Sequence, residues 1–443
     1  MNPTILKTPP APTEQPSQPL RRKLLGAASV NTVLALSGAG AIQRVHAQVV
    51  RTRKPLLIGL ATDDTGQYAA SGRDERRGMI MAINEANERG GVIGRRLEIT
   101  HTDTQGNAEV GASVAEQMIA RQGVAFLIGG VHSGVASAMS TVAQKFGCIY
   151  FNSNSSSPTE AGKDCHRTKF VWDGNSTNFS TSVVNGAMSG YGRDWVLITS
   201  DYGWGHNTAK GIRELISANG GRIVDELIVS QNTRDFRPQL ETIKKLSPRV
   251  VATAVGGEGL AILRAQVQAA GLDRSVGWIN NQQDWPDVYG LGRDSMFGVF
   301  GTTWYWGLKL PGVTDFVARY QKANPDYRIR TPGNVFYNGY MATRELLRAI
   351  ERTGSTNNIK LIRDLERLRV PARDRMQHFD AYMNPQTHQL QQTIYIASYN
   401  SRPTHKDDLF RILDQQRPED VQDRASGALC QLESLAALPT YEP

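Results

Sequence analysis

Leu56-Leu57-Ile58-Gly59-Leu60-Ala61 is a short apolar run, and the turn-forming stretch Thr62-Asp63-Asp64-Thr65-Gly66 follows it directly. Beyond the turn, apolar residues recur at helical spacing at Met79, Ala82, Ile83 and Ala86, and the Gly90-Gly91 pair ends the pattern. A run of six apolar residues fits a buried strand, whereas the spacing after the turn fits an amphipathic helix. The segment therefore predicts one strand–turn–helix unit.

The same unit recurs along the chain. Further strands are expected at residues 97–102, 125–129, 148–151, 195–200, 223–229, 250–255 and 276–279, with helical patterns between most of them. Strands that alternate with helices of this length form parallel sheets with right-handed crossovers. Because the alternation restarts after Trp172, the sequence predicts an α/β protein with two doubly wound parallel-sheet lobes.

The remainder of the chain has a different pattern. Helices are expected at 313–323, 334–353 and 359–368, and a hairpin at 379–399. These elements complete the two lobes more plausibly than they form a third domain, so the chain would cross between the lobes several times. The polar segment 401–443 is expected to be an extended tail on the surface.

The first 47 residues have the order of a secretory signal peptide. The basic run Arg21-Arg22-Lys23 precedes a mildly apolar, Gly/Ala-rich stretch, and small residues end it near Ala47. The paired arginines favour the twin-arginine export route. We therefore expect a mature protein that begins near Gln48 and works in the periplasm. A membrane anchor is the alternative, but the glycines make a poor spanning helix.

The distribution of charge, histidine and cysteine gives no support to a nucleic-acid-binding protein or a metalloprotein. Of the formal net charge of +8, the first 47 residues carry five basic groups against one acid, so the rest is only weakly basic. No basic stripe with interleaved aromatics predicts nucleic-acid binding. The scattered histidines predict no metal site. Cys148 lies in an apolar run and is expected to be buried, which leaves Cys165 and Cys430 as a candidate disulfide.

Five turns follow predicted strands and carry polar or aromatic side chains. In open parallel sheets, ligands bind at the carboxyl ends of strands, where helix N-termini point inward. Ser133 is expected to cap a helix there, and Tyr202 to cover an apolar ligand face. The candidate ligand-binding residues from these turns are Ser133, Asn154, Ser155, Ser156, Tyr202, Gly257, Glu258, Gln282 and Asp284. Together they predict one shared cleft.

Catalytic motifs are missing from the sequence. There is no Gly-x-Ser-x-Gly elbow, Walker loop or paired-histidine metal motif. Glu258 and Asp284 would suit either the carboxylate pair of a hydrolase or the binding of a cationic ligand, and the neutral surroundings favour binding. We therefore expect no catalytic residue and no cofactor.

The turns also carry a resemblance. The relevant motifs are Ile58-Gly59 with Thr65-Gly66 and Gly72, Ala82-Ile83-Asn84-Glu85 with Gly90-Gly91, Ile128-Gly129-Gly130, Tyr202-Gly203 with Gly205, and Gly271-Leu272. Over about residues 56–399 the chain resembles the leucine/isoleucine/valine-binding family of ABC importer receptors. The resemblance implies a type I periplasmic binding fold. One lobe would comprise 55–172 plus 304–378, the other 173–303 plus 379–400, joined by three hinge crossings.

The resemblance also implies roles for residues. Ser133 and Ser156 match the groups that hold a ligand carboxylate, Tyr202 the aromatic residue that closes over the ligand, and Tyr340 a pocket aromatic. The implied function is a monomeric, non-enzymatic receptor that delivers a small molecule to a membrane permease and its ATPase subunits. A ligand sensor of the same fold that reports to a regulator is the alternative.

Some departures bear on the ligand. Amino-acid binders of this family place an acid near Gln282, but the first acid here is Asp284, and Ser71 stands where an aromatic is frequent. A buried ammonium without a partner is costly. This cost weighs against a simple branched-chain amino acid, so an amide, a urea-like compound or a small carboxylate without an amine is expected at least as much as an amino acid. Trp304 and its neighbours would line the cleft or pack in the core.

Overall fold

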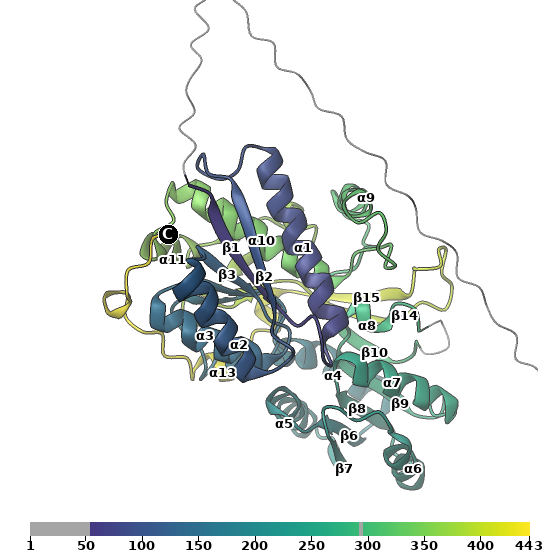
Figure 1. Ribbon diagram of the computed structural model, residues 1–443. Coiled ribbons are helices and arrows are strands. Elements are labelled where there is room, and N and C mark those ends of the chain that lie inside the picture. Colours follow the sequence, from purple (N-terminus) through teal and green to yellow (C-terminus); the bar gives the residue numbers. More distant parts are fainter. Residues whose placement is uncertain (1–53, 292–295) are drawn as a thin grey trace, which may run out of the picture. The chain divides into compact units, whose positions relative to one another are not determined.

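The structure, a computed structural model, describes residues 54–291 and 296–443 of the 443-residue chain. The predicted signal peptide, residues 1–47, lies outside the described residues. Within them, strands and helices alternate from Leu56 onward, as the apolar periodicity predicts (Figure 1).

The first sheet is parallel throughout and has the strand order β2-β1-β3-β4-β5. Its strands are β1 (Leu56–Thr62), β2 (Leu97–Asp103), β3 (Phe126–Gly129), β4 (Tyr150–Asn152) and β5 (Lys169–Val171). Ile58 lies opposite Ile99 on one side and Phe126 on the other. Since all of these strands point the same way, their carboxyl ends share one edge.

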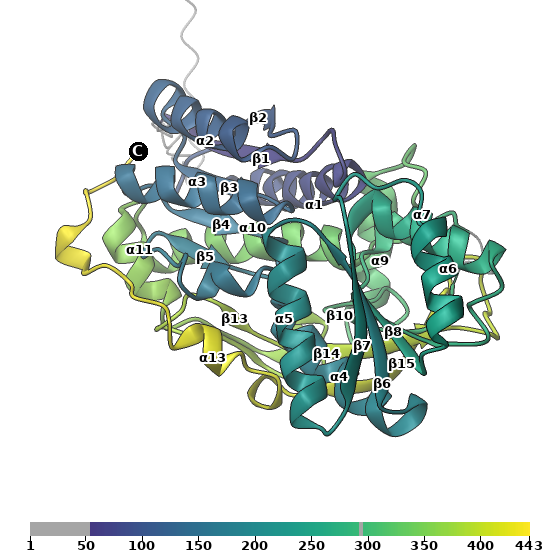
Figure 2. The ribbon, with the colours of Figure 1, turned by 90° about the horizontal axis from the view of Figure 1, so that it is seen from below.

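Helices cover both faces of this sheet. They are α1 (Ala69–Glu88), α2 (Ala108–Glu116), α3 (Ser133–Phe146), α10 (Asn334–Thr353) and α11 (Asn358–Leu365). Figures 1 and 2 show α2 beside α3. Neighbouring residues of one strand enter different cores: Ile128 packs in the cluster with α1 and α10, whereas Leu127 packs with α2 and α3. This alternation is the two-faced burial of a strand inside an α/β lobe.

The second sheet has the order β15-β14-β10-β9-β8-β6-β7. The first five strands of this sheet along the chain are β6 (Asp194–Ser200), β7 (Arg222–Val229), β8 (Val250–Ala254), β9 (Gly277–Gln282) and β10 (Val299–Thr302), and they are parallel. β14 (Ile394–Tyr399) and β15 (Phe410–Gln416) add to it antiparallel. The helices of this part are α4 (Ser176–Tyr191), α5 (Gly203–Ala218), α6 (Arg237–Leu246) and α7 (Gly257–Ala269).

Smaller elements complete the described chain. A three-stranded sheet joins β11 (Arg369–Val370), β12 (Ala381–Met383) and β13 (Leu390–Gln391). The remaining helices are α8 (Trp285–Val288), α9 (Val313–Ala323), α12 (Ala372–Arg375) and α13 (Arg424–Gly427), with short π or 3-10 turns at Gln117–Gln122, Pro158–Ala161, Pro418–Asp420 and Leu435–Ala437. Across residues 54–291 and 296–443, none of the helices has both the length and the apolar character needed to cross a bilayer.

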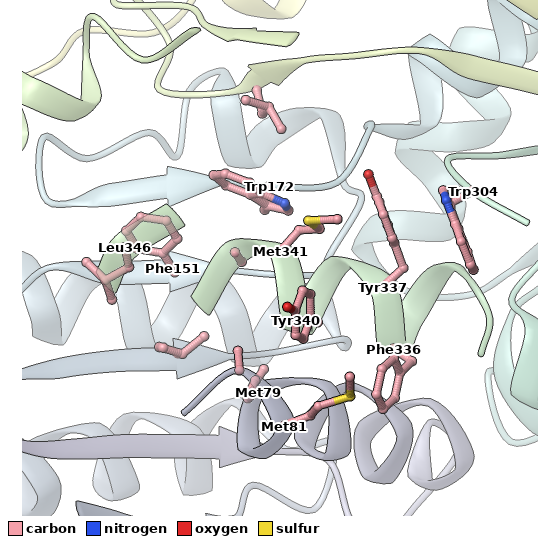
Figure 3. Packing of buried hydrophobic residues seen from close by; sticks show 14 of the residues in the cluster. Met79, Met81, Phe151, Trp172, Trp304, Phe336, Tyr337, Tyr340, Met341 and Leu346 are labelled. Atoms are coloured by element: carbon pink, nitrogen blue, oxygen red, sulfur yellow. The ribbon is translucent and has the colours of Figure 1, made fainter. Parts of the chain in front are cut away.

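Aromatic side chains fill the core behind the first sheet, where α10 packs against α1 (Figure 3). Trp304 is 1% exposed and stacks on Tyr337, with ring centroids 4.9 Å apart. Its indole nitrogen donates to the carbonyl of Met376 at 3.2 Å. Trp304 is therefore a core residue, and the alternative that it lines the cleft is wrong.

The segment after residue 400 differs from the expected surface tail. β15 pairs with β14 along six positions and extends the second sheet. This strand has no clear apolar pattern in the sequence, because it lies at the sheet edge and Phe410 is its only buried side chain. The structure corrects the prediction here: part of the supposed tail is an edge strand.

The remaining residues, 417–443, here named the C-terminal strap, connect the two sheets (Figure 2). The carbonyl of Val421 accepts a hydrogen bond from Asn178 on α4 at 2.6 Å. Further along, Cys430 forms a disulfide with Cys165, the pair suggested by the sequence, near the end of the first sheet. Cys148 is buried and free. The strap thus runs from the edge strand of the second sheet to the side of the first.

Candidate functional site

A small cavity lies where the carboxyl ends of both parallel sheets face each other. About 30 Å³ of it is accessible to a water-sized sphere, so little free space is left between its walls. Its walls come from both lobes and are formed by Tyr68, Val131, Ser133, Asn154, Ser156, Tyr202, Trp204, Val255, Gly256, Gly257, Leu260, Gln282, Asp284 and Asp287. Seven of the ten candidate ligand-binding residues lie in these walls, whereas Ser155, Glu258 and Tyr340 do not.

Direct contacts hold the two sides of the cavity together. The hydroxyl of Tyr68, just before α1, forms a hydrogen bond with the hydroxyl of Tyr202, which precedes α5. The side-chain amide of Gln67 donates to the carbonyl of Gly256 at 2.9 Å, and the amide of Glu258 donates to the carbonyl of Gln67 at 3.0 Å. The structure therefore represents a closed arrangement of the cleft.

Ser133 is at the cavity, but its local role differs from the prediction. The N-cap of α3 is His132, whose Nδ1 accepts from the amide of Gly134 at 3.1 Å, and Ser133 is the first helical residue. The backbone amide of His132 in turn donates to buried Asp63 at 2.8 Å. Because the imidazole performs the capping, the predicted cap is wrong by one residue, and the Ser133 side chain stays available at the cavity wall.

The serine-rich loop after β4 contributes two of its three candidates. Ser156 accepts a hydrogen bond from the indole nitrogen of Trp204 at 3.0 Å, across the cleft. Ser155 instead bonds the buried carboxylate of Glu160 at 3.2 Å, which forms an ion pair with Lys169. Ser155 is therefore part of the structural support of the loop, and its predicted role as a cavity residue is wrong.

Asn154 lines the cavity but uses its amide group elsewhere. Its nitrogen donates to Glu75 at 2.9 Å and to the carbonyl of Val335 at 3.2 Å. Glu75 on α1 also accepts from Ser153 at 2.6 Å. Burial raises the pKa of Glu75 to about 8, against the lowering effect of these two hydrogen bonds. Glu75 thus holds the loop from behind.

Aromatic rings form the roof of the cavity. Tyr202 stacks on His132 with centroids 5.3 Å apart and on Trp204 at 6.0 Å. Burial raises the pKa of the hydroxyls of Tyr68 and Tyr202, so both remain neutral donors and acceptors. Tyr202 lies in the cavity wall and contacts His132 on the facing turn, and its closing over a ligand stays a prediction.

Gly257 lies in the cavity wall as predicted, whereas its neighbour Glu258 does not. Gly257 lines the cavity with a positive φ of 58°, and a Cβ there would lie 2.6 Å from the carbonyl of Gln67, so only glycine allows the two lobes to touch. The carboxylate of Glu258 points away, is half exposed and pairs with Arg234 at 2.7 Å. Of the two acids considered together in the sequence, only Asp284 lies in the cavity wall, so the alternative of a carboxylate pair is not formed in this structure.

Two acids, Asp284 and Asp287, lie in the cavity wall, and a third, Asp173, is bonded to the wall residue Gln282. Asp284 accepts from Asn334 at 2.7 Å and from Gln282 at 3.1 Å. Gln282 also donates to Asp173, at 3.3 Å. Burial raises the pKa of Asp284, and burial together with the charge of Asp284 raises that of Asp287 well above its usual range and that of Asp173 to about 8. The cavity is thus polar and acidic on one side.

Tyr340 lies in the core between α1 and α10, away from the cavity (Figure 3). Its hydroxyl donates to Glu85 at 2.7 Å, and Arg319 donates to it at 3.1 Å. The role implied for Tyr340 by resemblance, a pocket aromatic, is therefore wrong: this hydroxyl faces an ion pair on the outer surface of the lobe.

Tyr68, Trp204 and Asp287 are cavity residues that the sequence analysis missed. In the sequence, Ser71 stands where an aromatic residue is frequent. In the structure, Tyr68, three residues earlier in the chain, supplies an aromatic side chain to the cavity wall. Asp287 follows Asp284 by three residues, and the intervening Trp285-Pro286 starts the short helix α8 that brings both acids to one side. The sequence could have indicated Asp287 as a cavity residue, because it lies within one helical turn of the candidate Asp284.

No cluster of three or more His, Cys, Asp or Glu side chains arranged to hold a metal ion occurs in the described part of the chain. Asp284 accepts hydrogen bonds from the neutral amides of Gln282 and Asn334 instead. The cavity therefore suits an organic ligand held by hydrogen bonds, charge and aromatic contacts.

The chain matches known proteins over most of its length. The family model described as periplasmic binding protein matches residues 55–404. A Leu/Ile/Val-binding protein homologue of Brucella melitensis is 26% identical over 320 residues, which cover 68% of this chain and 80% of that protein. The Leu/Ile/Val-binding protein BraC3 of Rhizobium johnstonii is 24% identical, covering 69% and 82%.

Solved structures share the fold. A periplasmic binding protein from Burkholderia mallei has a TM-score of 0.78 at 20% identity, covering 86% of this chain and 99% of that one. A solute-binding protein of Rhodopseudomonas palustris in complex with 3,4-dihydroxybenzoic acid has a TM-score of 0.75 at 20% identity, covering 84% and 99%. At this identity the likeness concerns the fold.

Proposed function

Because the chain belongs to the periplasmic binding protein family, we propose that it is the solute-binding protein of an ABC importer. It closes on a small polar ligand in the cleft and delivers it to permease and ATPase subunits in the inner membrane. The curated relatives are named for binding leucine, isoleucine and valine. The closed cleft, with walls from both lobes, supports this role because only the closed state lets one ligand touch both sides.

The observation that carries the proposal is the contact of Tyr68 with Tyr202 above the cavity. It joins one lobe to the other directly at the mouth, so the same two residues meet when the cleft closes and separate when it opens. The proposal keeps the lobes that the sequence predicts, 55–172 with 304–378 and 173–303 with 379–400, and adds β15 to the second lobe because it pairs with β14. A binding role without chemistry fits the family and the neutral partners of the cavity acids.

Export belongs to the same proposal. Arg21-Arg22 and the small residues before Gln48 support a cleaved twin-arginine signal peptide. The disulfide between Cys165 and Cys430 fits an oxidising compartment such as the periplasm. The receptor would work there as a monomer.

Scattering and calorimetry test the proposal together. The chain from Gln48 is titrated with amino acids, amides, amines and carboxylates while its radius of gyration is followed by small-angle X-ray scattering. A ligand that binds with one-to-one stoichiometry, lowers the radius and is recovered unchanged supports a receptor. Turnover of the bound compound, or binding without any closure, would refute it.

A further inference from the structure

The cavity has an unbalanced charge. Asp284 and Asp287 line it, and no lysine or arginine is among the residues of its wall. Across residues 54–291 and 296–443, neither aspartate forms an ion pair with a base, and the donors to Asp284 are the neutral amides of Asn334 and Gln282. Burial without a counter-charge favours the protonated form of these acids, and a cation that enters the cavity supplies the partner that their ionised form lacks.

Asp287 is the less satisfied of the two acids. Only 9% of the residue is exposed, and within the described residues no base forms an ion pair with it. Burial raises the pKa of Asp287, and the like charges of Asp284 and Asp74 add to this effect. Asp287 is therefore a buried acid at the cavity wall whose charged form lacks a positive partner.

The remaining walls suit an alkylated cation. Tyr68, Tyr202 and Trp204 present aromatic rings, and Tyr202 and Trp204 lie 6.0 Å apart at an angle of 30°. Aromatic faces attract ammonium groups through their quadrupole, most strongly when water is excluded. Val255 and Leu260 add apolar surface for methyl groups.

The side of the cavity predicted to hold a ligand carboxylate is poorly equipped for it. The amide of Asn154 is already used by Glu75 and Val335. Trp204 lies over Ser156, to which its indole donates. The side chains left to donate to a carboxylate there carry hydroxyl groups, and two aspartates but no base lie in the same cavity wall.

We infer that the cleft selects a small organic cation, an alkylammonium ion without a carboxylate. The ammonium lies between Asp284 and Asp287, and its methyl or methylene groups contact Tyr68, Tyr202 and Trp204. The space of about 30 Å³ restricts the ligand to a few heavy atoms. This inference rests on the proposed receptor function and names the substrate class of the same site.

Calorimetry with the chain from Gln48 at pH 8 tests the inference. The probes are methylammonium, trimethylammonium and tetramethylammonium chloride, with tert-butanol, acetamide, acetate, benzoate and leucine as neutral, anionic and zwitterionic competitors. We expect at least one ammonium ion to bind about 30-fold or more tightly than tert-butanol. Affinity falls by about this factor when a buried charge loses its partner.

Two variants locate the cation. Asp287→Asn should weaken ammonium binding about 30-fold or more, since it removes the partner charge and keeps the shape. Glu258→Gln, which neutralises a nearby acid outside the cavity, should change it less than about 2-fold. Asp287→Asn removes a buried charge, so the variant is expected to fold, and circular dichroism checks this.

Each outcome decides between the ideas. Binding of acetate, benzoate or leucine in preference to every ammonium ion overturns the inference and leaves the receptor function intact. Equal losses in Asp287→Asn and Glu258→Gln overturn the placement of the cation between the aspartates. Absence of binding and of closure with every probe refutes both the inference and the receptor function.

Discussion

Glu75 gives the sharpest test of the physical reasoning about this site. It is fully buried on α1 and accepts hydrogen bonds from Ser153 and Asn154, which hold the loop after β4. The substitution Glu75→Gln keeps the size and an acceptor oxygen but removes the proton equilibrium. Glutamine thus resembles the protonated acid, the form that burial favours.

The size of the effect follows from the pKa, which burial raises from 4.5 to about 8. Below about pH 4 both states hold the proton and the group has no effect. As the pH rises, the unfolded chain ionises first, so the folded state binds more protons and the free energy of unfolding falls. One group gives a slope of about 1.4 kcal/mol per pH unit, hence roughly 3 kcal/mol between pH 4 and 7 and at most about 5 kcal/mol by pH 9.

Urea unfolding followed by circular dichroism at pH 5, 6, 7 and 8 measures this slope. We expect the free energy of unfolding of Glu75→Gln to fall less steeply than that of the unmodified protein, so the stabilisation from the substitution grows by roughly 2 to 3 kcal/mol from pH 5 to 7. Glu88→Gln, an exposed position on the same helix, is the control and should leave the slope unchanged. Parallel curves for Glu75→Gln and the unmodified protein would show that burial does not govern this carboxyl.

Three further predictions concern other parts of the molecule. Cys430→Ser should lower the free energy of unfolding by about 2–5 kcal/mol in urea titrations, because it opens a loop of 265 residues; the reductant-treated parent should match it, and a smaller gap would contradict the assignment. Tyr202→Phe removes the hydroxyl that meets Tyr68, so ligand affinity in calorimetry should fall roughly 3- to 10-fold, with unaltered affinity as the contrary result. Replacing Arg21 and Arg22 together by lysine should leave the precursor in the cytoplasm on cell fractionation, whereas continued export would argue for another route.

The fold could be predicted to a large extent because strands and helices leave different periodicities in the sequence. Leu56 to Ala61 and the helix after it are where the pattern places them. Strands at the polar edge of a sheet are harder to predict from sequence. Because β15 buries few apolar side chains, the segment from Phe410 to Gln416 was predicted to be part of a surface tail. An edge strand is stabilised mostly by backbone hydrogen bonds, which leave little trace in side-chain chemistry.

The sequence predicts where the site lies better than it predicts what each side chain does there. Ser133, Tyr202 and Asp284 each follow a strand, and they lie at the cavity because the carboxyl ends of parallel strands share one edge. Which way a side chain points depends on partners far along the chain. Glu258 turns toward Arg234 and Tyr340 toward Glu85, and no local pattern encodes such pairings.

The C-terminal strap bears on how the two lobes can move. It begins after an edge strand in one lobe, bonds Asn175 and Asn178 at the start of α4, and is joined to the other lobe by the disulfide between Cys430 and Cys165. It is therefore a fourth connection beside the three expected from the sequence. Each further link between two lobes removes some of the relative orientations that they could otherwise adopt. Fewer open geometries leave a larger fraction of molecules competent to close, and the apparent affinity rises in proportion to that fraction.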